Sequence, residues 1–213
     1  MKGLKWNVFF AVIFLLAGGC SGPVQYSSAS SPAVGTAWGE EVRSTVTGIS
    51  VERAERDPAE VILINYSAKH STGYDRVYSI RISDLEYAVR DANFNSVPIT
   101  RFYNSSVGQW QYRLPAKVGA NYQLYVRNYS RDTNYEIVAT VDGLDVLNGK
   151  PGSLNNSGYI VNAGDSLAIK GFRKDKHTEA AFQFSDVSDA YAANSAQGDV
   201  RNIGVIGFAA FAL

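Results

Sequence analysis

The residues best suited to binding chemistry form an aromatic and basic group between positions 101 and 113. The group consists of Arg101, Tyr103, Trp110, Tyr112 and Arg113. Successive side chains of a strand point to opposite faces, so Trp110 and Tyr112 would share one face and could form a platform for a sugar ring beside the arginines. Tyrosine is also a good strand former that caps apolar cores, so a packing role is the alternative interpretation.

The element that must position this group is a β-hairpin. Residues 99–103 and 109–114 flank five polar or small residues that end in Gly108, as a hairpin loop would. Pro115 and the connector that follows it, residues 116–121, indicate a boundary between two subdomains.

The sequence contains no recognised set of catalytic residues. The two histidines, His70 and His177, lie in polar segments, where a surface position is expected for each. There is no Gly-x-Ser-x-Gly nucleophile motif, no His-Glu-x-x-His motif and no pair of cysteines. We therefore expect a protein that is not an enzyme and that uses no metal or cofactor.

Aspartates offer the remaining routes to chemistry. Asp142 with Asp145, and Asp186 with Asp189, are the carboxylate pairs that could hydrolyse a glycosidic bond if they met across a cleft. Asp142, Asp145 and Asp165 could instead bind calcium through oxygen ligands. Because aspartate next to glycine is explained by turn chemistry alone, a structural role is the simpler prediction for these residues.

The charge pattern does not indicate a nucleic-acid partner. The chain has 20 Lys and Arg residues against 20 Asp and Glu residues, with both signs scattered, whereas nucleic-acid binding needs a dense basic face. Lys170, Arg173, Lys174 and Lys176 form a local basic cluster that could contact anionic lipid or polysaccharide. A solvated loop is the alternative for this cluster.

The N-terminus predicts export. Lys2 and Lys5 precede an apolar run over residues 8–17, and small residues then lead to Cys20, which is the pattern of a secretory signal peptide over residues 1–19. The segment resembles the lipobox of bacterial lipoproteins, although Ala17 stands where leucine is commoner. By that resemblance Cys20 would be acylated and become the first residue of the mature protein; a buried free cysteine is the alternative.

A lipidated Cys20 has consequences for location and stability. It is the only cysteine, so the mature chain would have no disulfide, and acyl chains would anchor it to a membrane. In the enterobacterial rule, a residue other than Asp at the next position, here Ser21, implies the outer membrane. Residues 20–37 are rich in Ser, Gly, Ala and Pro and predict a flexible tether.

Residues 38–117 are predicted to form a smaller, mixed and mostly β N-terminal subdomain. Residues 60–66 are an apolar run typical of a buried strand, and residues 76–83 alternate as a strand does. The sequence Ser83-Asp84-Leu85-Glu86 has the capping-box pattern, which predicts a short helix over residues 84–92. The segment around Trp38 fits either a helix or a strand.

Residues 118–213 carry the clearer signal, which is that of an antiparallel β-sandwich. Short alternating runs are separated by turn residues such as Asp142-Gly143 and Asn148-Gly149. The last strand is apolar on both faces, so we place it centrally in a sheet. The residues predicted to be buried in this sandwich are Leu124, Val126, Ile137, Val141, Leu167, Ile169, Phe182, Phe184 and Val205.

Several short motifs in the second half also carry a resemblance. They are ValAspGlyLeuAspVal at 141–146, GlyTyrIleVal at 158–161, GlyPheArg at 171–173, AlaAlaPheGlnPhe at 180–184, TyrAlaAla at 191–193 and AsnIleGlyValIleGly at 202–207. Over about residues 122–211 the chain resembles an uncharacterised family of exported bacterial proteins. The resemblance implies no activity, ligand or catalytic residue.

These observations favour one function and leave two alternatives. The first is a non-enzymatic lipoprotein of the bacterial cell envelope that binds or scaffolds a protein partner. The second is a lipoprotein that binds envelope polysaccharide through the Trp110 hairpin, and the third is a hydrolase with an unrecognised site.

Overall fold

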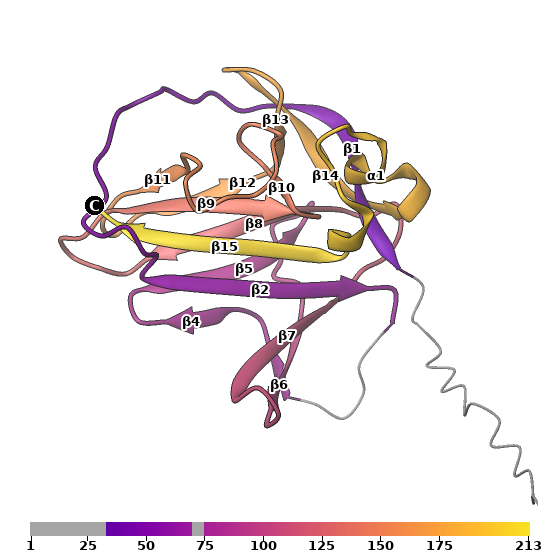
Figure 1. The fold of residues 1–213 in the computed structure, drawn as a ribbon, viewed down its shortest axis with the longest axis horizontal. Helices are drawn as coiled ribbons and strands as arrows, with labels where there is room; N and C mark the ends of the chain where they lie inside the picture. The colour runs from indigo at the N-terminus through magenta and orange to yellow at the C-terminus, as the bar shows by residue number, and fades with distance from the viewer. Residues whose placement is uncertain (1–32, 70–74) are drawn as a thin grey trace, which may run out of the picture. The chain divides into compact units, whose positions relative to one another are not determined.

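The protein is built from two β-sheets. The computed structural model describes residues 33–69 and 75–213, and these residues form one compact unit. Its strands form a seven-stranded and an eight-stranded sheet (Figure 1). This confirms the predicted mainly β fold, and the two facing sheets are those of a β-sandwich.

The seven-stranded sheet combines strands from both ends of the sequence. Its main path, in spatial order, is β1 (Val34–Arg43), β14 (Thr178–Asp186), β8 (Asn121–Asn128), β5 (Leu85–Asp91) and β4 (Ile80–Ile82), while β12 (Ser166–Ile169) also pairs with β8 and β13 (Gly171–Arg173) with β14.

The eight-stranded sheet also combines strands from both halves of the sequence. Its main path is β10 (Leu144–Asp145), β9 (Tyr135–Val141), β15 (Val205–Ala212), β2 (Glu60–Ser67), β7 (Gln109–Pro115), β6 (Ile99–Asn104) and β3 (Asp75–Val77), and β11 (Tyr159–Val161) also pairs with β9. The pairing of β2 with β7 is parallel, whereas the other strand pairs of the described residues are antiparallel.

Three short helical turns connect β14 to β15. They are η1 (Val187–Asp189), α1 (Tyr191–Asn194) and η2 (Val200–Asn202). In the described part of the chain, no helix is both long enough and apolar enough to cross a membrane.

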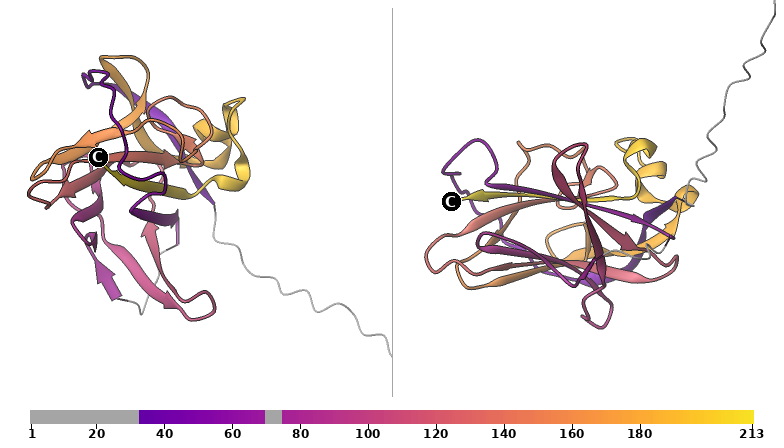
Figure 2. Two further views of the ribbon diagram at one scale, coloured as in Figure 1. Left: turned by 60° about the vertical axis from the view of Figure 1, so that its left-hand side comes forward. Right: turned by 90° about the horizontal axis from the view of Figure 1, so that it is seen from below.

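The main hydrophobic core lies between the two sheets, which appear as two layers in Figure 2. Leu124 and Val126 of β8 face it from one sheet, and Ile64 of β2 and Phe208 of β15 face it from the other. Burial of large apolar side chains on this scale is a major source of the stability of the fold. Seven of the nine predicted core residues are buried; the exceptions, Leu167 and Val205, are half-buried.

The predicted boundary near residue 117 does not separate two subdomains. Strand β8 from the second half pairs along its length with β5 from the first half, and β15 pairs with β2 over six residues. The first strand, β1, lies beside β14. Residues 118–213 therefore complete a sandwich only together with strands from residues 34–115.

The helix predicted over residues 84–92 is wrong, because these residues form strand β5. Leu85, Tyr87 and Val89 are buried at every second position, which is the period of a strand. Ser83 does not cap a helix; it has φ of 44° in the turn between β4 and β5. Pairing of β5 with β4 on one side and β8 on the other outweighs the local helix signal.

Two further predictions are corrected in detail. The strand predicted over residues 76–83 is divided into β3 and β4, which belong to different sheets. The ambiguous segment around Trp38 is a strand, β1, which begins at Val34 and is interrupted by an irregularity between Trp38 and Glu41. The tether predicted over residues 20–37 therefore overlaps β1 at its end, and its residues before Ala33 lie outside the described part.

Candidate functional site

Strand β2 exposes apolar side chains on the outer side of its sheet. Its even-numbered residues Ile62 and Ile64 point into the core, while Val61 and Leu63 are 55% and 56% exposed. Because successive side chains alternate in direction, an apolar run in a central strand must present two apolar faces. We call the outer surface around Val61 and Leu63 the β2 face.

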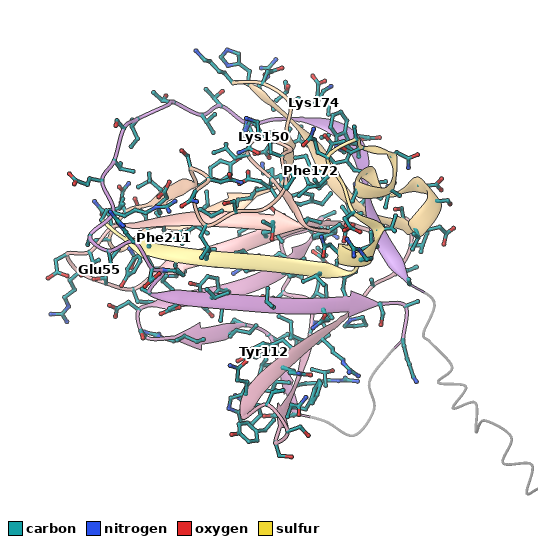
Figure 3. All side chains as sticks on the ribbon, in the orientation of Figure 1. Glu55, Tyr112, Lys150, Phe172, Lys174 and Phe211 are labelled. Carbon is teal, nitrogen blue, oxygen red and sulfur yellow. The ribbon has the colours of Figure 1, made fainter. Side chains whose placement is uncertain are left out.

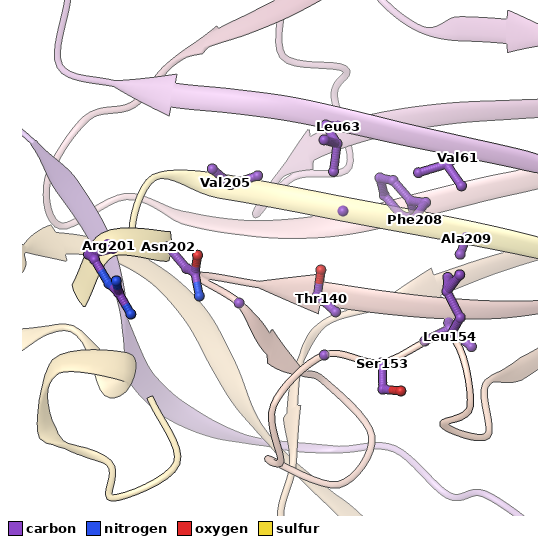
Figure 4. A pocket seen from close by; sticks show the side chains of 14 residues that line it. Val61, Leu63, Thr140, Ser153, Leu154, Arg201, Asn202, Val205, Phe208 and Ala209 are labelled. Atoms are coloured by element: carbon purple, nitrogen blue, oxygen red, sulfur yellow. The ribbon is translucent and has the colours of Figure 1, made fainter. Parts of the chain in front are cut away.

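The β2 face continues as a shallow groove across the neighbouring strand. Gly207 and Ala209 of β15 pair with Leu63 and Val61, and a Cβ atom on Gly207 would lie 2.6 Å from Oγ1 of Thr140. Small residues thus keep the floor of the groove low. The groove has a volume of about 450 Å³ and includes polar Arg201 and Asn202 at one end (Figure 4).

Part of this outer surface is covered by the chain itself. The Arg53 guanidinium lies 3.6 Å from the centre of the Phe211 ring and donates hydrogen bonds to Glu136 and to the carbonyl of Leu154. Phe211, Val138 and Ala209 consequently form a second, small buried cluster. Val61 and Leu63 lie beyond this cover and stay exposed.

The predicted hairpin is confirmed as β6 and β7, and it presents two exposed aromatic rings. Trp110 is 52% exposed and Tyr103 is 55% exposed, and their rings meet edge to face with centroids 5.5 Å apart. The Arg101 guanidinium lies 5.1 Å from the centre of the Trp110 ring and pairs with Asp75 at 2.6 Å.

The structure divides the five predicted hairpin residues. Arg101, Tyr103 and Trp110 contact one another on the hairpin. Tyr112, on β7 (Figure 3), is half-buried and packs against the core. Arg113 points to the other side, where it lies over the ring of Phe102 at 4.7 Å. The ring platform is therefore smaller than predicted and contains one exposed indole.

Asp142 belongs to a buried hydrogen-bond network. Its carboxylate accepts from the backbone amides of Thr36 and Gly204, each at 2.8 Å, and from the Tyr66 hydroxyl at 2.5 Å. Because Tyr66 donates its single proton to Asp142, Thr36 must donate to Tyr66, and the Tyr122 hydroxyl then donates to Thr36. We call these five residues the Asp142 cluster.

The Asp142 cluster is structural. Burial raises the pKa of Asp142 above its usual value and outweighs the opposing effect of the hydrogen bonds that it accepts. Asp142 has φ of 53° and Gly143 φ of 79°, so the turn signal in the sequence correctly predicted the backbone here. The carboxylate is fully used in joining strands, which leaves it no free oxygen to present to a substrate or ion.

The other aspartates do not assemble a site either. Asp145 is buried and accepts from the amides of Leu147 and Asn148, while Asp165 is exposed. Asp186 and Asp189 are exposed as well. Within residues 33–69 and 75–213, no three His, Cys, Asp or Glu side chains are grouped so that they could hold a metal ion.

The basic cluster is broken up by ion pairs. Arg173 is buried with Glu179, to which it donates, and it also donates to the carbonyl of Ser44 at 2.5 Å. Lys174 pairs with Glu41 at 2.6 Å. Of the four basic residues predicted to contact lipid or polysaccharide, Lys170 and Lys176 form no ion pair among the described residues.

The remaining predicted positions are His177, His70 and Cys20. His177 lies exposed in a turn, where its amide donates to Asp175. Cys20 with the signal peptide over residues 1–19, and His70, lie outside the described residues.

No protein-family model, no curated protein and no solved structure matches this chain. Sequence reasoning missed Val61 and Leu63, because it interpreted the run over residues 60–66 as a wholly buried strand. The available signal was that such a run needs a cover on both faces, and no segment of the sequence was assigned to cover the second.

Proposed function

We propose that this protein is a non-enzymatic lipoprotein of the bacterial cell envelope that binds a protein partner through the β2 face. Val61 and Leu63 are the observation that carries the proposal. Two large aliphatic side chains, each more than half exposed, lie side by side with a groove on a central strand, where packing within the domain does not use them. Contiguous exposed apolar surface of this kind marks interaction sites in soluble domains.

The composition of the face favours a protein over a charged or strongly polar ligand. Its β2 and β15 side is apolar, the uncharged Thr140 and Ser153 lie opposite, and the one charged lining residue, Arg201, lies at the end of the groove. An apolar centre with a polar rim is the anatomy of protein–protein interfaces. The predicted acylation of Cys20 fits this function, because a membrane-anchored domain can hold a second envelope protein at the membrane.

The proposal is tested by disrupting the β2 face in cells. A photo-crosslinking amino acid at position 63 of the full-length chain should capture a defined envelope protein. Leu63→Asp should abolish co-purification of that protein from membranes, because a desolvated carboxylate would be placed in the interface. Val118→Asp is the matched control, since Val118 is 47% exposed but does not line the groove.

An identical set of co-purified proteins from wild type and Leu63→Asp would refute the proposal. Circular dichroism must show that both variants are folded. The anchor is tested separately: Cys20→Ser should leave the precursor uncut and should release no acylated product, while wild-type protein should fractionate with the outer membrane.

Polysaccharide binding is a second candidate, because Trp110 exposes half of its surface beside Arg101. An indole face with a neighbouring guanidinium offers stacking and hydrogen bonding to a sugar ring. Binding of isolated envelope polysaccharide, measured by calorimetry, should weaken in Trp110→Ala. Equal binding by both proteins would exclude this surface.

A further inference from the structure

One of the two edges of strand β2, the edge that faces β7, is paired along only part of its length. On one side β15 pairs with residues 60–65, but on the other side β7 pairs only from Ile64 to Ser67. Residues 60–63 therefore have no strand partner on the β7 side within the described part of the chain. Figure 1 shows β7 diverging from β2 beyond this point.

The free edge carries backbone hydrogen-bonding groups. The amide of Tyr66 donates to Gly204 on the β15 side. Because the amide and carbonyl groups of a strand alternate between its two sides, those of Asn65, Leu63 and Val61 point to the β7 side. Asn65 is paired with Arg113 of β7, and the pairing of Ile64 with Tyr112 engages the Leu63 carbonyl. The Leu63 amide and both groups of Val61 have no strand partner on that side within the described residues.

The diverging strands enclose a cavity, which we call the notch. It has a volume of about 640 Å³, within the range of ligand sites. It is lined by β2, by Gly108 and residues 109–112 of β7, and by Ile82 of the facing sheet. Residues 109–111 of β7 pair with β6 on their other edge, so their β2-facing edge is free as well. The notch therefore lies between the free edges of β2 and β7, and it narrows towards the paired residues Ile64 and Tyr112.

The groups that line the notch determine what kind of ligand it can bind. Unpaired amide and carbonyl groups need a partner that offers both donors and acceptors at strand spacing, and an extended peptide provides this. Side chains of such a peptide would alternate between the β2 face, with Val61 and Leu63, and the inner side, with Ile82 and Trp110. Most of the lining side chains are apolar, with Asn65, Gln109 and Gln111 as the polar exceptions, so the peptide should carry mainly apolar side chains at successive positions.

We infer that the notch receives an extended apolar segment of the protein partner, which adds a strand to the free edge of β2. This inference rests on the proposed function and specifies how the partner is held. A segment without other structure suits the notch better than a strand of a second folded copy, because the notch closes at the Ile64–Tyr112 pair and is bounded on both sides.

The test uses a phage-displayed library of random dodecapeptides, panned against the full-length protein in detergent. Selected peptides should share at least four consecutive residues that are mainly apolar, and they should bind Val61→Pro at least about tenfold more weakly. Proline at Val61 removes an amide that points into the notch and leaves the β2–β15 hydrogen bonds intact, as edge positions of strands allow.

Backbone methylation of the selected peptides provides a measurement that needs no protein variant. N-methylation of alternate amides in one register should lower affinity at least about tenfold, because it removes the donors that face β2. The inference is overturned if no peptide is enriched over panning against an unrelated lipoprotein. It is also overturned if peptides bind Val61→Pro within twofold and tolerate methylation in both registers.

The two proposals fail differently. A partner that is lost with Leu63→Asp but kept by folded Val61→Pro would support docking on the β2 face and overturn strand addition. A partner that is indifferent to Leu63→Asp would overturn the proposed function, while the peptide measurements would still decide whether the notch accepts a strand.

Discussion

Replacing Tyr66 with phenylalanine should destabilise the protein far more than the loss of one oxygen suggests. Tyr66 lies on β2, and its hydroxyl connects Thr36 of β1 in the other sheet with Asp142 in the turn after β9. The ring would stay in place against Phe184, whose centroid is 5.2 Å away. The substitution therefore removes hydrogen bonds and little packing.

The magnitude follows from what each partner loses. A hydrogen bond to a charged group contributes about 1.5–3 kcal/mol and a neutral one about 0.5–1.5 kcal/mol. Asp142 keeps its two backbone donors, Thr36 and Gly204, but the hydroxyl pair Thr36–Tyr122 is left with one proton that has no acceptor. We expect Tyr66→Phe to lower the free energy of unfolding by about 2–4 kcal/mol.

The matched control is Tyr87→Phe. Tyr87 is also fully buried, but its hydroxyl makes a longer bond, 3.1 Å, to half-buried Glu60. We expect a loss of about 1.5 kcal/mol there, the lower end of the range for a charged acceptor, because the bond is long and water can replace the donor to Glu60. Urea unfolding of both variants, followed by circular dichroism, measures the difference. A Tyr66→Phe protein within about 0.5 kcal/mol of wild type, or a control that loses as much, would refute the linking role of the Asp142 cluster.

Three further predictions concern pH, a buried ion pair and the exposed indole. Burial raises the pKa values of Tyr66 and Tyr122, so the free energy of unfolding should be independent of these groups below about pH 10 and fall above it, where the unfolded chain ionises first. Urea midpoints from pH 8 to pH 12 measure this; a constant midpoint would contradict it. Glu179→Ala should cost about 3–5 kcal/mol in urea unfolding, because it leaves Arg173 buried without its countercharge, and a loss below 1 kcal/mol would exclude that role. Trp110→Ala should lower the free energy of unfolding by less than about 1.5 kcal/mol, mostly from the lost contact with Tyr103, and an unfolded variant would show instead that the ring is part of the core.

Local patterns in the sequence predicted what is decided locally. The hairpin around Gly108 and the turn at Asp142-Gly143 have the predicted backbone, since these turns depend on which residues accept positive φ. The alternation in β8 and β9 correctly identified Leu124, Val126 and Ile137 as core residues. Such features need no knowledge of distant strands.

Strand order could not be predicted in this way. The pairing of β5 with both β4 and β8 converts a capping-box sequence into a strand, and the pairing of β15 with β2 joins residues about 140 positions apart. Both outcomes depend on long-range partners that a single sequence does not specify. For the same reason the sequence divided at Pro115 a chain whose two halves contribute to both sheets.

The candidate site shows the same division. Sequence correctly placed Trp110 and Tyr103 on one hairpin, because their spacing and the loop length are local. The sequence could not show that only residues 112–115 of β7 pair with β2. The divergence of the two strands before this point creates the notch and leaves Trp110 exposed. The β2 face could not be recognised either, because both sides of this strand are apolar in sequence and only the fold determines which side is covered.

The hairpin geometry also separates the two binding modes proposed for this protein. Trp110 lines the notch and is also the exposed ring of the sugar-binding candidate, so Trp110→Ala is expected to weaken either ligand. Tyr103 stands beside Trp110 but does not line the notch. If polysaccharide stacks on the hairpin, Tyr103→Ala should weaken polysaccharide binding by about fivefold and leave the selected peptides unaffected, whereas Val61→Pro should do the reverse. Calorimetry with both ligands on both variants measures this pattern. If each variant instead weakened both ligands, the two binding surfaces would not be independent. The exposed Tyr103 ring and the free edge of β2 would then both act through a common change in the hairpin.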